Sequence, residues 1–389
     1  MNNKAIININ DIYNKNLNFL IGSGASHGLF PTLELSIMDE SGNKQTIETL
    51  ARHFDVENNH KLKTLLFMYY YKVCIKPALE EDYEYIELLG NKDEVKVMAN
   101  YQQLIRSILE VLQRRKKFNK RCNIFTTNYD GCIVNAADNI LETGDMEFVI
   151  NDGTNGFLKR YLHAKNFSRF TCDTGVFERH QSDIPQINLV HLHGSIYWSL
   201  TDDSISVNYS KSQNKSCYIN EDLFPDLEEF STCLNDSSKT IDDIPDINLV
   251  NKDQNAFWDA YNRIPIVNPT KWKFHETVFE EHYYQMLRLL SYELEKPNPV
   301  LISFGFSFAD EHIRNLIKRS LSNPKLQVFI CCFNEVDKKT VSNHFNQFKN
   351  VQLITVDDCL NFDAFNNQVF FSTIDKEEQR TSDESSNEI

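Results

Sequence analysis

Apolar and polar residues alternate along the chain in blocks that predict strands followed by helices. Short apolar runs that end in polar or turn-forming residues are typical of buried strands, whereas apolar residues at three- and four-residue spacing indicate amphipathic helices. The alternation is clearest over residues 299–356, where strand, helix, strand, helix and strand follow one another. Further strand-like runs lie within the segments 16–26, 121–141, 187–198 and 264–270. Strands that alternate with helices form parallel sheets covered on both faces, so we predict an α/β, Rossmann-like fold.

Two long stretches interrupt this alternation. Residues 45–118 show mostly helical periodicity and predict a helical module inserted after the first strand. Residues 201–256 are polar, acidic and rich in Asn, Asp and Ser, and predict an insertion with little regular structure. We assign residues 1–374 to one α/β domain that contains both insertions. Residues 375–389 are charged and almost free of apolar side chains, so we expect a disordered acidic tail.

The composition indicates a globular protein with a substantial core. The 389 residues are 41% apolar and 12% aromatic. The formal net charge of −15 makes direct nucleic-acid binding an unfavoured function, and we interpret the dense basic stretch at 113–121 as a solvated helix end. The nine cysteines lack paired spacing, which indicates reduced thiols and a cytoplasmic location. No apolar run has the length of a signal-peptide core or a membrane span, so we expect no membrane association.

Small or hydrogen-bonding residues follow four of the predicted strands. In an open parallel sheet, ligands bind beyond the carboxyl ends of the strands. A sheet that needed only stability would not require such residues at each of these ends. The four clusters are Gly22-Ser23-Gly24-Ala25-Ser26, Thr126-Thr127-Asn128-Tyr129-Asp130, His191-Leu192-His193-Gly194-Ser195 and Gly305-Phe306-Ser307-Phe308-Ala309-Asp310.

The first cluster has the character of a phosphate-binding loop. Gly22 and Gly24 would let the backbone approach a pyrophosphate, with free N–H groups supplied by the start of the following helix. The next glycine, Gly28, stands one residue later than in the usual dinucleotide-binding fingerprint. A tight turn that binds no ligand is the alternative.

The third cluster contains two histidines that share a strand face, His191 and His193. A zinc site needs further ligands at recognisable spacing, and the sequence offers none, so we expect no metal. His193, followed by Gly194, suits a general base that faces a cleft, and a structural histidine is the alternative. The sequence has no G-x-S-x-G motif and no P-loop lysine, which leaves acyl hydrolase and NTPase functions without support.

The motifs GSGAS, TTNYD, HLHGS and GFSFAD, in this order, resemble the sirtuin-like family, specifically its bacterial branch that hydrolyses NAD. The resemblance covers most of residues 17–335, apart from the two insertions. It implies that Asn128 holds the ribose and orders the attacking water, that Asp130 lies at the nicotinamide end, and that His193 is the catalytic histidine near the ribose hydroxyls. The implied NAD contacts are Gly22, Ser23, Gly24, Ala25 and Ser26 in the first loop, Thr127 and Gly194 beside the catalytic residues, and Gly305, Ser307 and Asp310 at the adenosine half.

These residue types suit the removal of nicotinamide from NAD+, which builds positive charge at C1′ of the ribose. An asparagine orients a hydroxyl and a water without adding charge, and a histidine accepts a proton at neutral pH. The resemblance implies an NAD+ glycohydrolase that takes NAD+ as its substrate and depletes it in bacterial anti-phage defence. Constant activity would kill the host cell, so we expect gating by homo-oligomerisation or by a separate protein, with a HerA-type ATPase favoured. The 45–118 module and an amphipathic helix at 275–296 are candidate oligomer surfaces, and simple packing on the sheet is the alternative.

The chain departs from the family's pattern in two respects. It lacks the four-cysteine zinc ribbon of protein-deacylating sirtuins, and its stretch HGLFPTL (27–33) lacks the family's Asp-Phe-Arg after the proline. Both departures weaken a deacylase function, and the second puts the nicotinamide-pocket contacts in doubt. The alternatives are an NAD- or ADP-ribose-binding sensor or scaffold subunit without turnover, or a deacylase or ADP-ribosyltransferase. The sequence leaves open the oligomer size, the activating signal and whether the product is linear or cyclic ADP-ribose.

Overall fold

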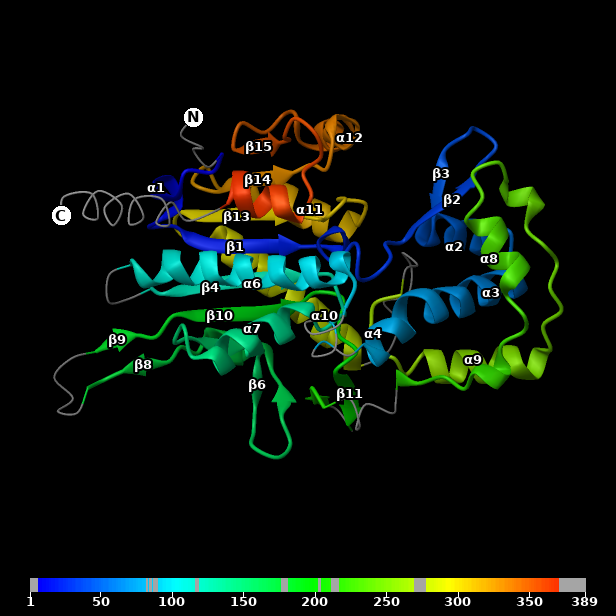
Figure 1. Ribbon diagram of the computed structural model, residues 1–389, viewed down its shortest axis with the longest axis horizontal. Helices are drawn as coiled ribbons and strands as arrows, with labels where there is room; N and C mark the ends of the chain where they lie inside the picture. The colour runs from blue at the N-terminus through cyan, green and yellow to red at the C-terminus, as the bar shows by residue number, and fades with distance from the viewer. Residues whose placement is uncertain are drawn as a thin grey trace, which may run out of the picture.

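Seven strands form the central sheet of the protein (Figure 1). The computed structural model describes residues 6–81, 83, 86, 90–115, 119–175, 181–201, 204–210, 217–268 and 278–370. In spatial order the strands are β15 (Val351–Ile354), β14 (Gln327–Cys331), β13 (Pro299–Phe304), β1 (Asn16–Ile21), β4 (Arg121–Thr126), β10 (Gln186–His191) and β5 (Val149–Asn151). All neighbouring strands run parallel, which confirms the predicted α/β, Rossmann-like architecture.

The order of the strands reverses at β1. The chain first adds β4, β5 and β10 on one side of β1, and then adds β13, β14 and β15 on the other side. β1 and β13 are direct neighbours, aligned from Asn16 opposite Pro299 to Ile21 opposite Phe304. A crevice for ligands forms beyond the carboxyl ends of the strands where the strand order reverses in this way. The fold therefore favours a ligand site above the junction of β1 and β13.

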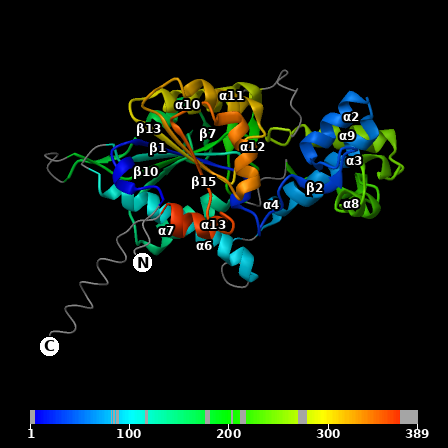
Figure 2. The same cartoon turned by 90° about the horizontal axis from the view of Figure 1, so that it is seen from above.

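Helices cover both faces of this sheet (Figure 2). One face carries α6 (Lys92–Gln113), α7 (Cys132–Thr143) and the short α13 (Phe362–Ala364), and the other carries α10 (Val278–Glu295) and α11 (Glu311–Ser320). α12 (Glu335–Phe345) packs against β15. α6 starts at a capping box formed by Asn91 and Glu94, and it buries a stripe that includes Tyr101, Leu104 and Ile108.

A side lobe lies beyond the carboxyl end of β1 (Figures 1 and 2). It combines α2 (Ile47–Val56), α3 (His60–Tyr70) and a hairpin of β2 (Glu34–Met38) and β3 (Lys44–Thr46) with α8 (Glu228–Leu234) and α9 (Asn251–Tyr261). The described residues within 45–118 are mostly helical, as predicted, but their helices have two locations, because α2 and α3 lie in the lobe and α6 lies on the sheet. The described part of 201–256, expected to have little regular structure, contains β12 (Ser204–Val207), α8 and the start of α9, with irregular segments between them.

Aromatic residues explain why these separate segments meet in the lobe. Phe67 of α3 lies 5.0 Å from Trp258 and 5.3 Å from Tyr261, measured between ring centroids. α3 then continues through a π-helical turn (Tyr71–Ile75) into α4 (Lys76–Glu80). The irregular turn ends two residues before Pro77, which lacks the N–H group needed for a regular helical hydrogen bond.

A small antiparallel sheet extends from the main body. It contains β11 (Trp198–Thr201), β12 (Ser204–Val207), β7 (Tyr161–Leu162) and β6 (Thr154–Asn155), and a separate hairpin pairs β8 (Cys172–Asp173) with β9 (Ser182–Asp183). The remaining elements are α1 (Ile9–Ile12) and short helical turns at Ser23–Ala25, Ala164–Ser168, Glu221–Leu223, Ile241–Asp243 and Phe365–Val369. The strand expected at 264–270 is reduced, over its described part 264–268, to an isolated bridge between Ile266 and Gly194.

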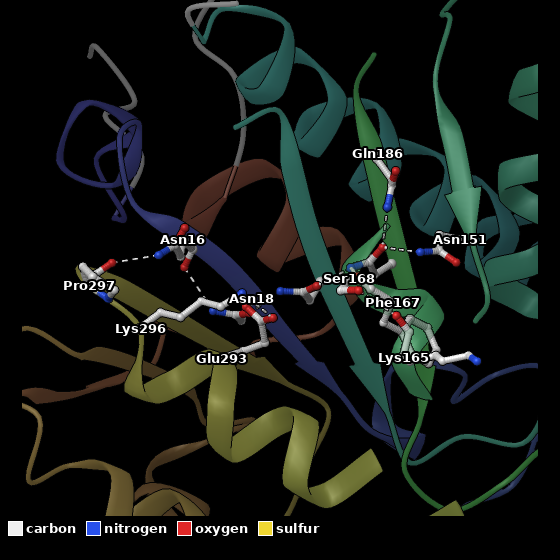
Figure 3. A network of polar contacts seen from close by, with 12 residues as sticks. Asn16, Asn18, Asn151, Lys165, Phe167, Ser168, Gln186, Glu293, Lys296 and Pro297 are labelled. Atoms are coloured by element: carbon white, nitrogen blue, oxygen red, sulfur yellow. Dashed lines mark hydrogen bonds and ion pairs between the residues drawn. The ribbon is translucent and has the colours of Figure 1, made fainter. Parts of the chain in front are cut away.

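A row of asparagines crosses the sheet interior (Figure 3). Asn18, Asn123, Asn188 and Asn151 occupy aligned positions of β1, β4, β10 and β5. The Asn123 amide donates to Asn18 Oδ1 (2.7 Å), the Asn188 amide to Asn123 Oδ1 (2.8 Å), and the Asn151 amide to Asn188 Oδ1 (3.1 Å). Each amide thus provides the partner that its neighbour needs away from water.

Two further sequence expectations concern the C-terminal tail and helices that could span a membrane. The tail at 375–389, expected to be disordered, lies outside the described residues. Within the described parts of the chain, no helix combines the length and the apolar character needed to cross a membrane.

Candidate active site

The glycine loop after β1 packs directly on the loop after β13. The Gly24 amide donates to the Gly305 carbonyl (2.9 Å), and the Gly22 amide donates to Phe304 (3.0 Å). A Cβ atom at Gly22 or at Gly24 would overlap backbone atoms of Gly305, and Gly305 itself has a φ of +67°. Glycine is therefore required on both sides of this contact, because no side chain fits between the two backbones.

The expected helix start after the glycine loop was wrong. The segment Ser23–Ala25 forms a single 3-10 turn. The amides of Gly24, Ala25 and Ser26 donate to Gly305, Gly22 and Ser23 within the protein. These three N–H groups are therefore not free for a pyrophosphate in this conformation, whereas Ser23 and Gly24 are exposed at the surface of the loop.

Ser26 links the glycine loop to the loop after β4. Its hydroxyl donates to Asp130 Oδ2 (2.8 Å), and it lies 3.1 Å from Asn128 Nδ2 and 2.8 Å from the Tyr101 hydroxyl. Asp130 Oδ1 accepts from the Cys132 amide (3.0 Å). Ser26, Asn128, Asp130 and Tyr101 are all buried.

The single hydroxyl proton of Ser26 fixes the direction of these hydrogen bonds. Ser26 donates that proton to Asp130, so it accepts from Asn128 and from Tyr101. The Asn128 amide nitrogen is thereby turned towards Ser26. Asn128 Oδ1 is left buried without a partner among the described residues. An unsatisfied buried acceptor costs about 1–3 kcal/mol, so a ligand hydroxyl or water that donates to Oδ1 would be favoured there.

Asp130 has an orienting role in this arrangement. Both of its oxygens accept from protein donors, so it orients Ser26 and Asn128. Burial raises the pKa of Asp130, and the Cys132 amide and the Ser26 hydroxyl oppose that rise. A direct contact between Asp130 and the nicotinamide end of NAD remains a prediction.

His193 lies beside Asp310, and this pair was not anticipated from the sequence. His193 Nε2 is 3.0 Å from Asp310 Oδ2, and the two side chains are 24% and 21% exposed. Asp310 Oδ1 also caps α11 by accepting from the amides of His312 (2.8 Å) and Ile313 (3.0 Å). Burial acts to raise the pKa of Asp310, but the hydrogen bond and charge of His193, together with the two amides, outweigh burial and lower it.

The remaining predicted contact residues stabilise the conformation of the strand-end loops. Gly194 has a φ of +81°, and a Cβ atom there would overlap the Pro265 carbonyl. The Thr127 amide donates to Ile21 at the end of β1 (3.1 Å). In the loop after β13, the hydroxyl of the exposed Ser307 accepts from the Ala309 amide (3.3 Å). These contacts hold the strand-end loops in place around the site.

The four predicted clusters form a closed circuit of hydrogen bonds. The loop after β10 joins the loop after β4 through His191 Nδ1 and the Asn128 carbonyl (3.1 Å). The circuit continues from β4 to β1 through Asn128 and Ser26, from β1 to β13 through Gly24 and Gly305, and from β13 back to β10 through Asp310 and His193. Since β4 and β1 separate β10 from β13 in the sheet, the last link crosses above the reversal of strand order.

Sequence reasoning missed Tyr101 and gave no separate role to His191. Tyr101 lies on α6, within the stretch interpreted as an inserted helical module. Its helical periodicity marks it as a core residue, and no local motif distinguishes its hydroxyl from that of any other buried tyrosine. His191 was considered only as a metal ligand together with His193.

The comparisons with known proteins give no family assignment, because the sequence matches no protein-family model and no curated protein. In the described part of the chain, no group of three or more His, Cys, Asp or Glu side chains is arranged to hold a metal ion. The absence of a metal requirement remains a prediction.

Proposed function

We propose that the protein is an NAD+ glycohydrolase that converts NAD+ to nicotinamide and ADP-ribose. The observation that carries this proposal is the closed circuit of hydrogen bonds among four strand ends. It gathers Asn128, His193 and the glycine loop around the reversal of strand order, where a dinucleotide is expected to bind. The motifs in this circuit are those that resemble the NAD-hydrolysing branch of the sirtuin-like family.

The reaction needs an acceptor for a ribose hydroxyl or for the attacking water. Asn128 Oδ1 is buried and has no partner among the described residues, so it suits this role. Accepting a hydrogen bond there would hold the ribose or the water without placing a full negative charge beside the developing cation at C1′.

The reaction also needs a group that removes a proton. Asp310 accepts from His193 Nε2 when that nitrogen carries the proton, which leaves Nδ1 of the neutral ring as the base. Nδ1 would accept the proton that the ribose hydroxyl or the water releases. Asp310 would then stabilise the imidazolium, although the pair is partly exposed and solvent weakens its charge interaction.

The proposed physiological role is NAD+ depletion in bacterial anti-phage defence, gated by homo-oligomerisation or by a partner, with a HerA-type ATPase favoured. One hydrogen bond connects the side lobe to the loop that carries Asn128, and could transmit such gating. The Tyr70 hydroxyl of α3 donates to the Tyr129 hydroxyl (3.2 Å), and Tyr129 stands between Asn128 and Asp130. A partner that moved the side lobe would therefore act on the loop that carries Asn128.

The outer face of α10 offers a surface for self-association. Tyr284 and Tyr292 of this helix are 63% and 62% exposed, with the exposed Arg288 between them. Aromatic residues and arginine are enriched where protein surfaces associate.

The test measures nicotinamide release from NAD+ by the purified full-length protein, beside the variant Asn128→Ala. Release by the wild type alone supports the hydrolase. If the wild type is silent, the measurement is repeated with the candidate ATPase partner. Tight NAD+ binding with continued silence would contradict the proposal and favour a sensor or scaffold subunit. Release that depends on an acyl-lysine peptide or a protein acceptor would favour a deacylase or an ADP-ribosyltransferase.

A further inference from the structure

We propose that His191 is a positioning residue that donates through Nδ1–H to the Asn128 carbonyl and so fixes the direction in which the Asn128 side chain faces the substrate. The inference deepens the proposed function and rests on it, because it concerns the same asparagine. It assigns to His191 a role distinct from that of His193, two residues further along the chain.

The geometry determines which ring nitrogen of His191 carries the proton. His191 is the last residue of β10 and is aligned with Thr126, the last residue of β4. Its Nδ1 atom lies 3.1 Å from the Asn128 carbonyl oxygen. A carbonyl oxygen only accepts, so Nδ1 must hold the hydrogen. In the neutral ring Nε2 is then an acceptor, and it is buried without a partner among the described residues.

The surroundings of His191 keep the ring neutral and immobile. Burial lowers the pKa of His191 to about 4, while the hydrogen bond to Asn128 and the charge of Asp152 act in the opposite direction. Asp152 is itself engaged, because Arg160 (2.9 Å) and the Tyr209 hydroxyl (3.0 Å) both donate to its Oδ2 atom. The Trp198 ring packs edge-on against the imidazole, 6.0 Å away between centroids.

Asn128 is held at three points, and His191 supplies one of them. Its amide donates to Thr126 Oγ1 (3.0 Å), its side-chain amide donates to Ser26 (3.1 Å), and its carbonyl accepts from His191. Without His191 the carbonyl would lose its partner, and the peptide that joins Asn128 to Tyr129 would be free to rotate. The backbone at Asn128 would then be less constrained, so that Cα, and with it the side chain and Oδ1, could shift away from the position seen here.

The first arm of the test observes the proton directly and does not depend on activity. The full-length protein, labelled with 15N at its histidines, is examined by long-range 1H–15N NMR, and the His191 signals are assigned by their loss in His191→Asn. We expect the proton on Nδ1, with the ring still neutral at pH 6. A proton on Nε2 would overturn the proposal whether or not the protein turns over NAD+.

The second arm compares two substitutions at His191. The Nδ2 group of Asn can occupy the place of the imidazole Nδ1–H, whereas Leu fills the space without a donor. We expect kcat for nicotinamide release to fall by about tenfold to a hundredfold in His191→Leu, and to stay within about threefold of wild type in His191→Asn. Equal losses in both variants would mean that the ring or Nε2 is what matters, and would overturn the proposal.

Separate control measurements distinguish a failure of the positioning role from misfolding of the variant and from a failure of the proposed function. Circular dichroism and thermal unfolding show whether His191→Leu is folded, and if it is not, the NMR result and His191→Asn decide the question. If the wild type releases no nicotinamide, the proposed function fails and NAD+ affinity replaces turnover as the readout. Weaker binding in His191→Leu but not in His191→Asn would then support the positioning role, and equal binding in both would overturn it.

Discussion

His193 Nε2 lies 3.0 Å from Asp310 Oδ2, although the two residues follow strands that are separated by two others in the sheet. The contact therefore crosses the point where the strand order reverses. It joins the two halves of the sheet above the position where a dinucleotide is expected to lie.

The first prediction concerns this pair. On the usual scale of acid–base catalysis, His193→Ala is expected to lower nicotinamide release by at least about a hundredfold, and Asp310→Asn by about 10- to 100-fold. Asn still caps a helix, so α11 should persist in Asp310→Asn. Steady-state kinetics measures both, with Glu311→Gln, on the exposed neighbouring position, as the control that should retain wild-type turnover. A loss of only a few-fold in His193→Ala would return His193 to a structural role.

The second prediction concerns Asn128. Its replacement by Ala removes the unpartnered buried Oδ1 together with the hydrogen bond from Nδ2 to Ser26, and is expected to abolish turnover while leaving the protein folded. The measurement pairs nicotinamide release with a thermal unfolding scan. Unchanged turnover in a folded variant would remove Asn128 from the mechanism.

The third prediction separates two serines of the glycine loop. Ser26→Ala removes the donor to Asp130 and leaves a buried carboxylate oxygen without that partner, so the free energy of unfolding should fall by about 1–3 kcal/mol. Ser23 is exposed, and Ser23→Ala should be close to neutral. Urea unfolding of both variants measures the difference. Equal stabilities would show that the Ser26–Asp130 hydrogen bond contributes little.

The fourth prediction is a pH dependence of stability caused by His191. Burial lowers its pKa to about 4 in the folded protein, against the ordinary value of 6.5 for a solvated histidine, so between these values the unfolded chain binds a proton that the folded protein does not. The free energy of unfolding therefore has its full value above pH 6.5 and falls by about 3 kcal/mol in total as the pH falls towards 4. Carboxyl groups also titrate in this range, so the quantity to measure is the difference between wild type and His191→Asn in urea unfolding at pH 7 and pH 4.5. Parallel stability curves would contradict the prediction.

The parallel sheet and the four strand-end clusters could be predicted from the sequence because both are local signals. Residues 299–356 show apolar runs of strand length between amphipathic helices, and the structure contains β13, α11, β14, α12 and β15 there. The polar clusters could be placed at one edge because the carboxyl ends of parallel strands meet there.

The side lobe and the Tyr101 contact could not be predicted, because they depend on pairing over long distances in the sequence. Phe67 meets Trp258, which lies in a distant part of the chain, and α8 and α9 arise in a segment whose polar composition suggested irregular structure. Tyr101 reaches Ser26 only because α6 packs over the sheet. Nothing in the spacing of apolar residues distinguishes a helix on the sheet from a helix in the lobe.

The asparagine row across β1, β4, β10 and β5 has a consequence for how the protein folds. The Oδ1 atoms of Asn18 and Asn123 accept from the next asparagine of the row, which requires that the strands be aligned. A strand that paired one residue out of step would turn its asparagine to the other face of the sheet and leave such a buried oxygen without this donor, at a cost of about 1–3 kcal/mol for each oxygen. Parallel sheets assemble slowly from distant segments and expose apolar surface while they do so. The row would therefore select the correct strand register during folding, because it destabilises misaligned intermediates more than an all-aliphatic interior would.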